Sequence, residues 1–255
     1  MKNRALLLLI LLAVHPLPAQ EAKSPLAIAA AADLVYCLAD IDQEFTRQHP
    51  GADLKVTTGS SGNFFTQLQH GAPFDIFLSA DVNFPRELAK AGLADSASLT
   101  TYAVGRIVLW TTRDDIDVSR GLAIVNDSAV KKFAIANPDH APYGRAAKAA
   151  LEHAELWEAA SKKLVLGENI AQTAQFVQTG NAEAGVVALS LVLAPPVTKV
   201  GHWIEIPPDS YPRLEQGAII TAHGAKNPLA PAYLAFLRSP EARAILDRYG
   251  FRLPK

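Results

Sequence analysis

Four short segments of the chain combine small side chains with hydroxyl or amide groups at the expected start of a helix. They are Ala30-Ala31-Ala32-Asp33, Gly59-Ser60-Ser61-Gly62-Asn63, Ala141-Pro142-Tyr143-Gly144 and Gly167-Glu168-Asn169-Ile170. The first turn of a helix leaves N–H groups unpaired and carries about half a positive charge. Small residues let an anion reach those N–H groups. Each segment alone is more typical of an ordinary capped turn, but together the four segments predict an oxyanion site built from neutral donors.

Residues that would mark an enzyme or a metal site are absent or wrongly spaced. The run Gly59-Ser60-Ser61-Gly62 lacks the Gly-x-Ser-x-Gly spacing of a nucleophile elbow, and no phosphate-loop motif occurs. The seven histidines include no His-Glu-x-x-His and no pair four residues apart. Asp75 and Asp81 flank one strand and are interpreted as caps that support a cleft wall rather than as an acid–base pair. We therefore expect no catalytic residue, no cofactor and no bare metal cation.

The elements that would position these loops alternate between buried strands and amphipathic helices. Short apolar runs predict strands at 26–30, 54–58, 76–78, 133–136, 164–166, 184–188 and 203–206. Helical periodicity predicts helices at 34–48, 63–70, 85–91, 144–155, 170–179, 230–237 and 240–248. Alternation of this kind favours parallel βαβ units.

Two further apolar runs mark places where the chain would cross between lobes. One is 103–110, which is expected to be a single long strand, and the other is 218–221. The predicted fold class is therefore α/β with two lobes, each a mixed, mostly parallel sheet flanked by helices. Residues 24–102 plus 218–255 would form lobe 1, and residues 103–217 lobe 2. Pockets commonly lie in the cleft between such lobes.

The first nineteen residues have the anatomy of a secretory signal peptide. Lys2 and Arg4 precede an apolar run over 5–14, which a proline-rich stretch then ends. Ten apolar residues make about 15 Å of helix, roughly half of a bilayer core, so a membrane span is a poor alternative. We expect residues 1–19 to be removed after Ala19 and the remainder to be exported to a periplasm.

Composition excludes several other classes of protein. The chain of 255 residues carries 24 basic and 25 acidic residues, and loss of residues 1–19 would leave a net charge of −3. With 49% hydrophobic residues and no basic block, it is typical of a globular protein and gives no footprint for nucleic acid. The one cysteine, Cys37, is expected to be a small buried residue. Tyr102, Trp110 and Trp203 are likewise assigned to the core.

Seven motifs in order, spread over residues 26–254, resemble one known family. They are Ala-Ala-Ala-Asp-Leu at 30–34, Gly-Ser-Ser-Gly-Asn-Phe-Phe at 59–65, Gly-Ala-Pro-Phe-Asp-Ile-Phe-Leu-Ser-Ala-Asp at 71–81, Ala-Asn-Pro at 136–138, Ala-Pro-Tyr-Gly-Arg-Ala-Ala at 141–147, Gly-Glu-Asn-Ile-Ala-Gln at 167–172 and Arg-Tyr-Gly-Phe at 248–251. The chain resembles the periplasmic molybdate-binding proteins of ABC importers, which are two-lobed solute-binding proteins of type II. The resemblance implies a monomer that binds molybdate or tungstate without counter-ions and delivers it to a membrane permease.

The resemblance also implies which residues bind the ligand. By motif they are Ala32, Asp33, Ser60, Ser61, Tyr143, Asn169 and Ile170. Ser61 would donate from its hydroxyl and its N–H, and Tyr143 and Ile170 from their backbone N–H groups. Many members place a donating tyrosine where this chain has Ala188, and we expect the Tyr143 hydroxyl to replace it.

Asp33 departs from the family, which often has a hydroxyl residue at this position. A carboxylate beside a dianion costs about 4 kcal/mol at 4 Å with an effective dielectric of about 20. Its side chain could turn away and cap its own helix, or take up a proton. Alternatively the ligand itself could carry a proton that Asp33 accepts, and this option makes a phosphate receptor the alternative within the binding class.

Three further alternatives are an enzyme and two receptors for other ligands. A secreted serine hydrolase would need a base near Ser60 or Ser61, and none is close in the sequence. A receptor for an organic acid would ordinarily need an arginine clamp, and Arg145 is the one basic residue beside a predicted loop. A ferric-ion receptor would need several anionic ligands.

Overall fold

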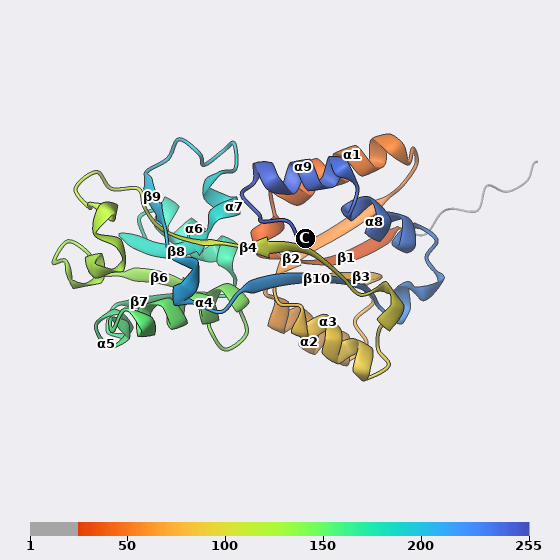
Figure 1. Cartoon of the computed structure of the whole chain (residues 1–255), viewed down its shortest axis with the longest axis horizontal. Coiled ribbons are helices and arrows are strands. Elements are labelled where there is room, and N and C mark those ends of the chain that lie inside the picture. The colour runs from red at the N-terminus through yellow and green to blue at the C-terminus, as the bar shows by residue number, and fades with distance from the viewer. Residues whose placement is uncertain (1–24, 255) are drawn as a thin grey trace, which may run out of the picture.

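The computed structural model describes residues 25–254, which form two α/β lobes side by side (Figure 1). Each lobe is built on a five-stranded sheet that mixes parallel and antiparallel neighbours. The predicted two-lobed fold class is therefore confirmed. The expected signal peptide at 1–19 lies outside the described residues. Among residues 25–254, no helix is both long and apolar enough to cross a membrane.

Lobe 1 contains the N-terminal strands and the C-terminal helices. Its strands are β1 (Leu26–Ala31), β2 (Leu54–Gly59), β3 (Ile76–Ser79), β4 (Thr100–Gly105) and β10 (Leu214–Ile220). Its helices are the 3₁₀ helix η1 (Ala32–Leu34), α1 (Cys37–Gln48), α2 (Ser61–Gln69), α3 (Asn83–Lys90), η2 (Ser96–Ser98), η5 (His223–Lys226), α8 (Leu229–Leu237) and α9 (Pro240–Arg248). The strand order is β2-β1-β3-β10-β4, with β10 antiparallel to both of its neighbours.

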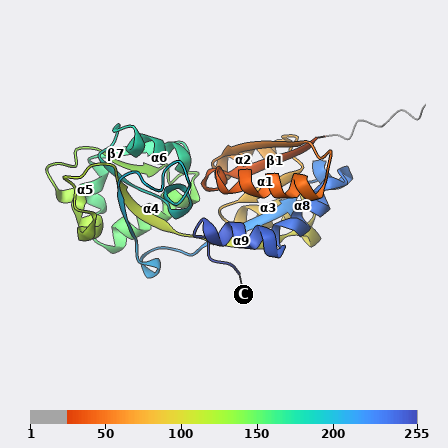
Figure 2. The same ribbon diagram turned by 90° about the horizontal axis from the view of Figure 1, so that it is seen from above.

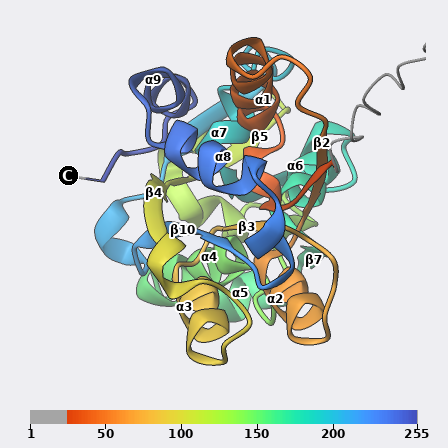
Figure 3. The ribbon, with the colours of Figure 1, turned by 90° about the vertical axis from the view of Figure 1, so that its right-hand side faces the viewer.

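Helices cover both faces of the lobe 1 sheet, and its strand β1 is apolar at every position. Viewed end-on, α1, α8 and α9 lie over one face, and α2 and α3 lie over the other (Figure 3). Along β1, Ile28 and Ala30 belong to the core under α1 and α8, whereas Ala29 packs with the α2 and α3 side chains Phe64 and Leu88. This is the twofold alternation of a strand buried on both sides.

Lobe 2 repeats the same architecture with residues from the middle of the chain. Its strands are β5 (Ile107–Thr111), β6 (Phe133–Ala136), β7 (Leu164–Gly167), β8 (Ala184–Ala188) and β9 (His202–Glu205), in the order β7-β6-β8-β5-β9. Its helices are η3 (Val118–Asn126), α4 (Pro142–His153), α5 (Trp157–Ser161), α6 (Ile170–Gln178), α7 (Leu189–Val192) and η4 (Pro208–Ser210). The side chains of α4 and η3 pack on one face of the sheet, and those of α6 pack on the other.

Two crossings join the lobes, and both can be followed in the view from above (Figure 2). The apolar run 103–110 is two strands and not one, because β4 ends in the first sheet and β5 begins in the second, with Arg106 between them. The return crossing lies between β9 and β10. The expected lobe limits after 102 and after 217 therefore fall inside β4 and β10. Arg106 forms a bidentate ion pair with Glu205, which ties the two crossings together.

Several other expectations need correction or gain detail. The helix expected over 34–48 is divided into η1 and α1, and α5, α7 and η3 were not predicted. Cys37, Tyr102 and Trp110 are buried as expected. Trp203 is 39% exposed on the edge strand β9, so its assignment to the core was wrong.

Candidate ligand-binding site

The four loops singled out in the sequence converge on one small cavity between the lobes. It is lined by residues that follow β1, β2 and β3 in lobe 1 and β6 and β7 in lobe 2. All seven residues expected at the site line it, namely Ala32, Asp33, Ser60, Ser61, Tyr143, Asn169 and Ile170. The convergence follows from topology, because the carboxyl ends of parallel strands meet at the same edge of a sheet.

The two lobes are closed over this cavity. Ala32 and Ala80 of lobe 1 belong to the same buried cluster as Tyr143 and Ile170 of lobe 2. The cavity is small, and most of the residues that line it are buried. A ligand held here would be small and removed from solvent.

Three helix N-termini supply the donors. α2 begins at Ser61, α4 at Pro142 and α6 at Ile170, and all three starts line the cavity. Over residues 25–254, no side chain caps α2 or α4, whereas Asn169 caps α6 by accepting from the Gln172 N–H at 3.0 Å. None of the lining residues is basic. The cavity therefore offers helix dipoles and neutral N–H groups to an anion.

The two serines of the second loop have different tasks. Ser61 is 1% exposed, and its hydroxyl oxygen accepts from the Ala80 N–H at 2.9 Å. This bond fixes the oxygen and leaves the hydroxyl hydrogen available for a ligand. The Ser60 hydroxyl instead donates to the His140 carbonyl of the opposite lobe at 2.7 Å. Ser60 thus lines the cavity, but its hydroxyl serves the contact between the lobes.

Asp33 is held in a buried polar network. Its Oδ2 accepts from the Tyr143 hydroxyl at 2.9 Å and from Gln216 Nε2 at 2.5 Å. Gln216 Nε2 also reaches the Tyr143 oxygen at 3.2 Å, and the Tyr102 hydroxyl donates to Gln216 Oε1 at 2.7 Å. Asp33 Oδ1 is buried and has no hydrogen-bond partner within the described part of the chain. Both hydrogen bonds that the carboxyl group accepts are therefore made to Oδ2.

The network decides two expectations about the site. The Tyr143 hydroxyl uses its hydrogen on Asp33, so the expectation that it replaces the donor missing at Ala188 does not hold here. Asp33 does not cap its own helix either, since its side chain bonds to Tyr143 and Gln216. Burial raises the pKa of Asp33 to about 6, and the hydrogen bonds from Gln216 and Tyr143 oppose that rise. Burial and Asp33 together raise the pKa of Tyr143, which therefore keeps its proton.

Direct contacts across the cleft surround the cavity. The Gly62 N–H donates to the His140 carbonyl at 2.9 Å, and Asn63 Nδ2 donates to a Glu168 carboxylate oxygen at 2.5 Å. A Cβ on Gly62 would lie 2.4 Å from the His140 oxygen, so only glycine permits this approach.

Arg145 forms a further contact between the lobes and does not enter the cavity. It pairs with Asp81 of lobe 1 at 2.7 Å, and its guanidinium lies over the Phe84 ring, 5.4 Å from the ring centroid. It is therefore no clamp for an organic acid. Asp75 has separate partners, the Ala27 N–H and His223, so the two aspartates do not share a task.

Ser60, His140 and Glu168 superficially resemble a hydrolase triad. His140 Nδ1 lies 2.9 Å from Ser60 Oγ, and His140 Nε2 lies 3.8 Å from a Glu168 oxygen. However, the Ser60 hydrogen is donated to the His140 carbonyl, so the ring nitrogen facing Oγ must be the donor of that contact. A general base must accept the nucleophile's proton, and this orientation is the reverse.

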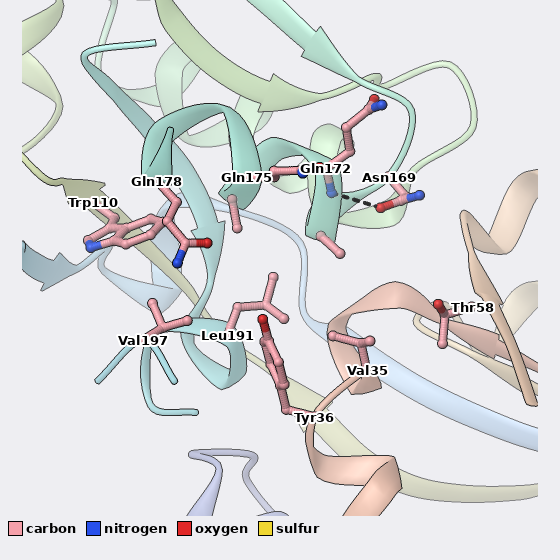
Figure 4. A pocket seen from close by; sticks show the side chains of 12 residues that line it. Val35, Tyr36, Thr58, Trp110, Asn169, Gln172, Gln175, Gln178, Leu191 and Val197 are labelled. Carbon is pink, nitrogen blue, oxygen red and sulfur yellow. Dashed lines mark hydrogen bonds between the residues drawn. The ribbon is translucent and has the colours of Figure 1, made fainter. Parts of the chain in front are cut away.

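A wider groove adjoins the closed cavity through Asn169. It offers about 390 Å³ to water between η1 and β2 of lobe 1 and α6 of lobe 2. Figure 4 shows the amides of Gln172, Gln175 and Gln178 on α6, with Tyr36 on the facing lobe. In residues 25–254, no cluster of three or more His, Cys, Asp or Glu side chains could hold a metal ion.

Gln216 and Tyr102 are the residues of the site that the sequence did not reveal. The expected strand at 218–221 began too late to include Gln216, which is fully buried in β10. A glutamine beside an apolar strand segment was the available signal, because a buried amide requires partners.

The fold and the cavity define a two-lobed solute-binding protein whose ligand is enclosed between the lobes. Residues 26–252 match the family described as bacterial extracellular solute-binding protein, and the chain belongs to that family. It is 40% identical to the molybdate-binding protein ModA of Azotobacter vinelandii over 226 residues, which cover 89% of both chains. It is 38% identical to ModA of Rhodobacter capsulatus over 225 residues, covering 88% of this chain and 86% of that one. The solved Azotobacter vinelandii periplasmic molybdate-binding protein superposes with a TM-score of 0.84 at 29% identity, covering 89% of this chain and 99% of that one.

Proposed function

We propose that this protein is the periplasmic receptor of an ABC importer and that its ligand is molybdate, with tungstate bound in the same way. One observation carries the proposal: the first turns of α2, α4 and α6 and the free hydrogen of Ser61 face one small, closed cavity without a basic lining residue. Relatives at 38–40% identity are molybdate-binding proteins.

Neutral donors suit a ligand that must be both held and released. Closure removes the anion from water, and N–H dipoles act on it more strongly in the protein interior than in water. Hinge motion at the two crossings would release the anion. Molybdate and sulfate carry the same charge, so the protein must discriminate by cavity size and donor placement. The closed receptor, acting as a monomer, would present both lobes to its membrane permease.

Binding of tetrahedral anions tests the proposal directly. The protein without residues 1–19 is mixed with molybdate, tungstate, sulfate, phosphate or acetate, and its melting temperature is measured. A ligand bound only by the native state raises that temperature, by an amount equivalent to about 2.7 kcal/mol at a hundredfold excess over Kd. We expect a rise with molybdate and tungstate that exceeds the rise with any other anion. If the melting temperature rises with phosphate alone, the ligand is phosphate and not molybdate.

A hydrolase is the competitor from another class, and the Ser60–His140 contact gives it a specific test. We expect no turnover of chromogenic esters or phosphoesters, because the Ser60 hydrogen is committed to a carbonyl. Turnover that disappears in Ser60→Ala would make the protein an enzyme.

A further inference from the structure

The directions of the hydrogen bonds around Asp33 restrict where a proton on this carboxyl group can sit. Oδ2 already accepts from the Tyr143 hydroxyl and from Gln216 Nε2. In the structure Gln216 directs its NH₂ group toward Asp33, and its Oε1 accepts from the Tyr102 hydroxyl. A proton on Asp33 therefore belongs on Oδ1, the oxygen that has no partner within residues 25–254.

A protonated Oδ1 would be a donor without an acceptor in the protein. Asp33 lines the small cavity beside Ser61 and Tyr143, and its side chain is buried. A buried donor that lacks a partner is costly, and a ligand oxygen in the cavity would satisfy it. An ionised Oδ1 would instead face the same ligand oxygen with like charge.

We propose that Asp33 is a specificity-determining residue that binds the oxyanion as a neutral acid, donating a hydrogen bond from Oδ1, so that each dianion is captured together with one proton. This inference rests on the proposed function. The proton comes from solvent. The ionised carboxylate, the dianion and one proton give a complex in which the carboxyl group is neutral and the anion keeps its two charges. The selected ligand is an oxyanion that is fully ionised at neutral pH. Hydrogen phosphate would bring its own proton and would require Asp33 to stay ionised.

The groups that surround Asp33 do not supply an alternative counter-charge. Tyr143 on α4, Tyr102 on β4 and Cys37 on α1 have pKa values raised by burial and are neutral. α6 and α7, which pack against η1, contain no ionisable residue. On β2, Lys55 pairs with an aspartate outside the cavity at 2.9 Å. On β10, the ionisable residue is a glutamate that pairs with Arg213 at 3.3 Å.

Calorimetry with molybdate between pH 6 and pH 8.5 tests the proposal. With the pKa of Asp33 at about 6 in the free protein, the wild type should bind about 50-fold more weakly at pH 8 than at pH 6. Titrations in buffers of different ionisation enthalpy should show uptake of about one proton per molybdate at pH 8. A constant Kd over this range with no proton uptake would overturn the proposal.

Asp33→Asn is the matched variant, because an asparagine reproduces the neutral acid. Its carbonyl can accept from Tyr143 and Gln216 while its NH₂ replaces the Oδ1 hydroxyl. We expect its Kd for molybdate to be independent of pH and, at pH 8, about 100-fold lower than that of the wild type. Folded Asp33→Asn that no longer binds molybdate would overturn the proposal. If this variant fails to fold, the proton uptake measured with the wild type decides whether the proposal stands.

Failure of this inference and failure of the proposed function give different results. Wild-type protein that binds molybdate with a flat pH profile removes the role of Asp33 and keeps the receptor. Wild-type protein that shows no melting shift with molybdate at pH 6 removes both. Asp33 would have the opposite role, an ionised acceptor for a protonated ligand, if phosphate binds without proton uptake and Asp33→Asn abolishes that binding. This result would overturn the proposal.

Discussion

Replacement of Ser61 by alanine removes one hydroxyl that has two separate partners. Its oxygen accepts from the Ala80 N–H at 2.9 Å, and its hydrogen is free for the ligand. In the ligand-free protein, Ser61→Ala leaves the buried Ala80 N–H without an acceptor, which costs about 1–3 kcal/mol of unfolding free energy. In the complex, the oxyanion also loses a donor. We expect a further loss of about 1–3 kcal/mol of binding free energy, a Kd about 5- to 150-fold higher.

Calorimetry with molybdate and denaturant unfolding of the ligand-free protein separate the two losses. Thr111→Val is the control, because the buried Thr111 hydroxyl also has two partners, the Glu183 carbonyl at 2.6 Å and the Arg113 N–H at 3.2 Å, but does not line the cavity. Both variants should lose stability, and only Ser61→Ala should lose affinity. An unchanged Kd for folded Ser61→Ala would refute the assignment of the second loop as a donor.

Three other changes test closure and the buried charges. Gly62→Ala would place a Cβ 2.4 Å from the His140 oxygen, so we expect the binding free energy for molybdate to fall by about 1–3 kcal/mol. If molybdate compacts the wild type in small-angle scattering, this variant should not become compact, and a variant that still closes would contradict the role of the contact. Arg145→Ala should raise Kd by no more than about fivefold, because its ion pair with Asp81 is half-exposed, and the increase in Kd should be smaller at high salt. Adding Asp81→Ala to this variant should not change Kd further. Burial raises the pKa of Asp42 to about 6, so its neutral form stabilises the fold below about pH 4 and that contribution, up to about 3 kcal/mol, is lost as pH rises through 6. Between pH 4.5 and pH 8 the free energy of unfolding should fall less with rising pH in Asp42→Asn than in the wild type. Equal pH dependence in the two proteins would contradict the raised pKa of Asp42.

The sequence predicted the positions of the loops because strand–helix alternation survives in local patterns. The short apolar strands 133–136 and 184–188 agree with β6 and β8 at both ends. Small and polar residues after β1, β2, β6 and β7 identified the four loops, and topology then brings them together. A crossing was predicted within 103–110, but its place at Arg106 and the division into two strands were not, because an apolar pattern does not reveal which sheet each half joins.

The parts of the site that were missed depend on contacts between distant residues. Gln216 and Asp33 are 183 positions apart in the chain, and their pairing decides how the carboxyl group is oriented. The Tyr143 hydroxyl was expected in the cavity because only its loop was visible in the sequence, whereas its bond to Asp33 depends on how the lobes pack. Trp203 was assigned to the core by residue type, but β9 is an edge strand, where side chains reach solvent.

The most direct test of the central claim is a crystal structure of the protein grown with molybdate, with diffraction measured on both sides of the molybdenum absorption edge. The account predicts one strong anomalous peak between the lobes, with oxyanion oxygens within hydrogen-bond distance of the Ser61 hydroxyl and of the Tyr143 and Ile170 N–H groups. A peak outside the cavity lined by these residues, or a protein crystallised with molybdate that shows no peak, would contradict it.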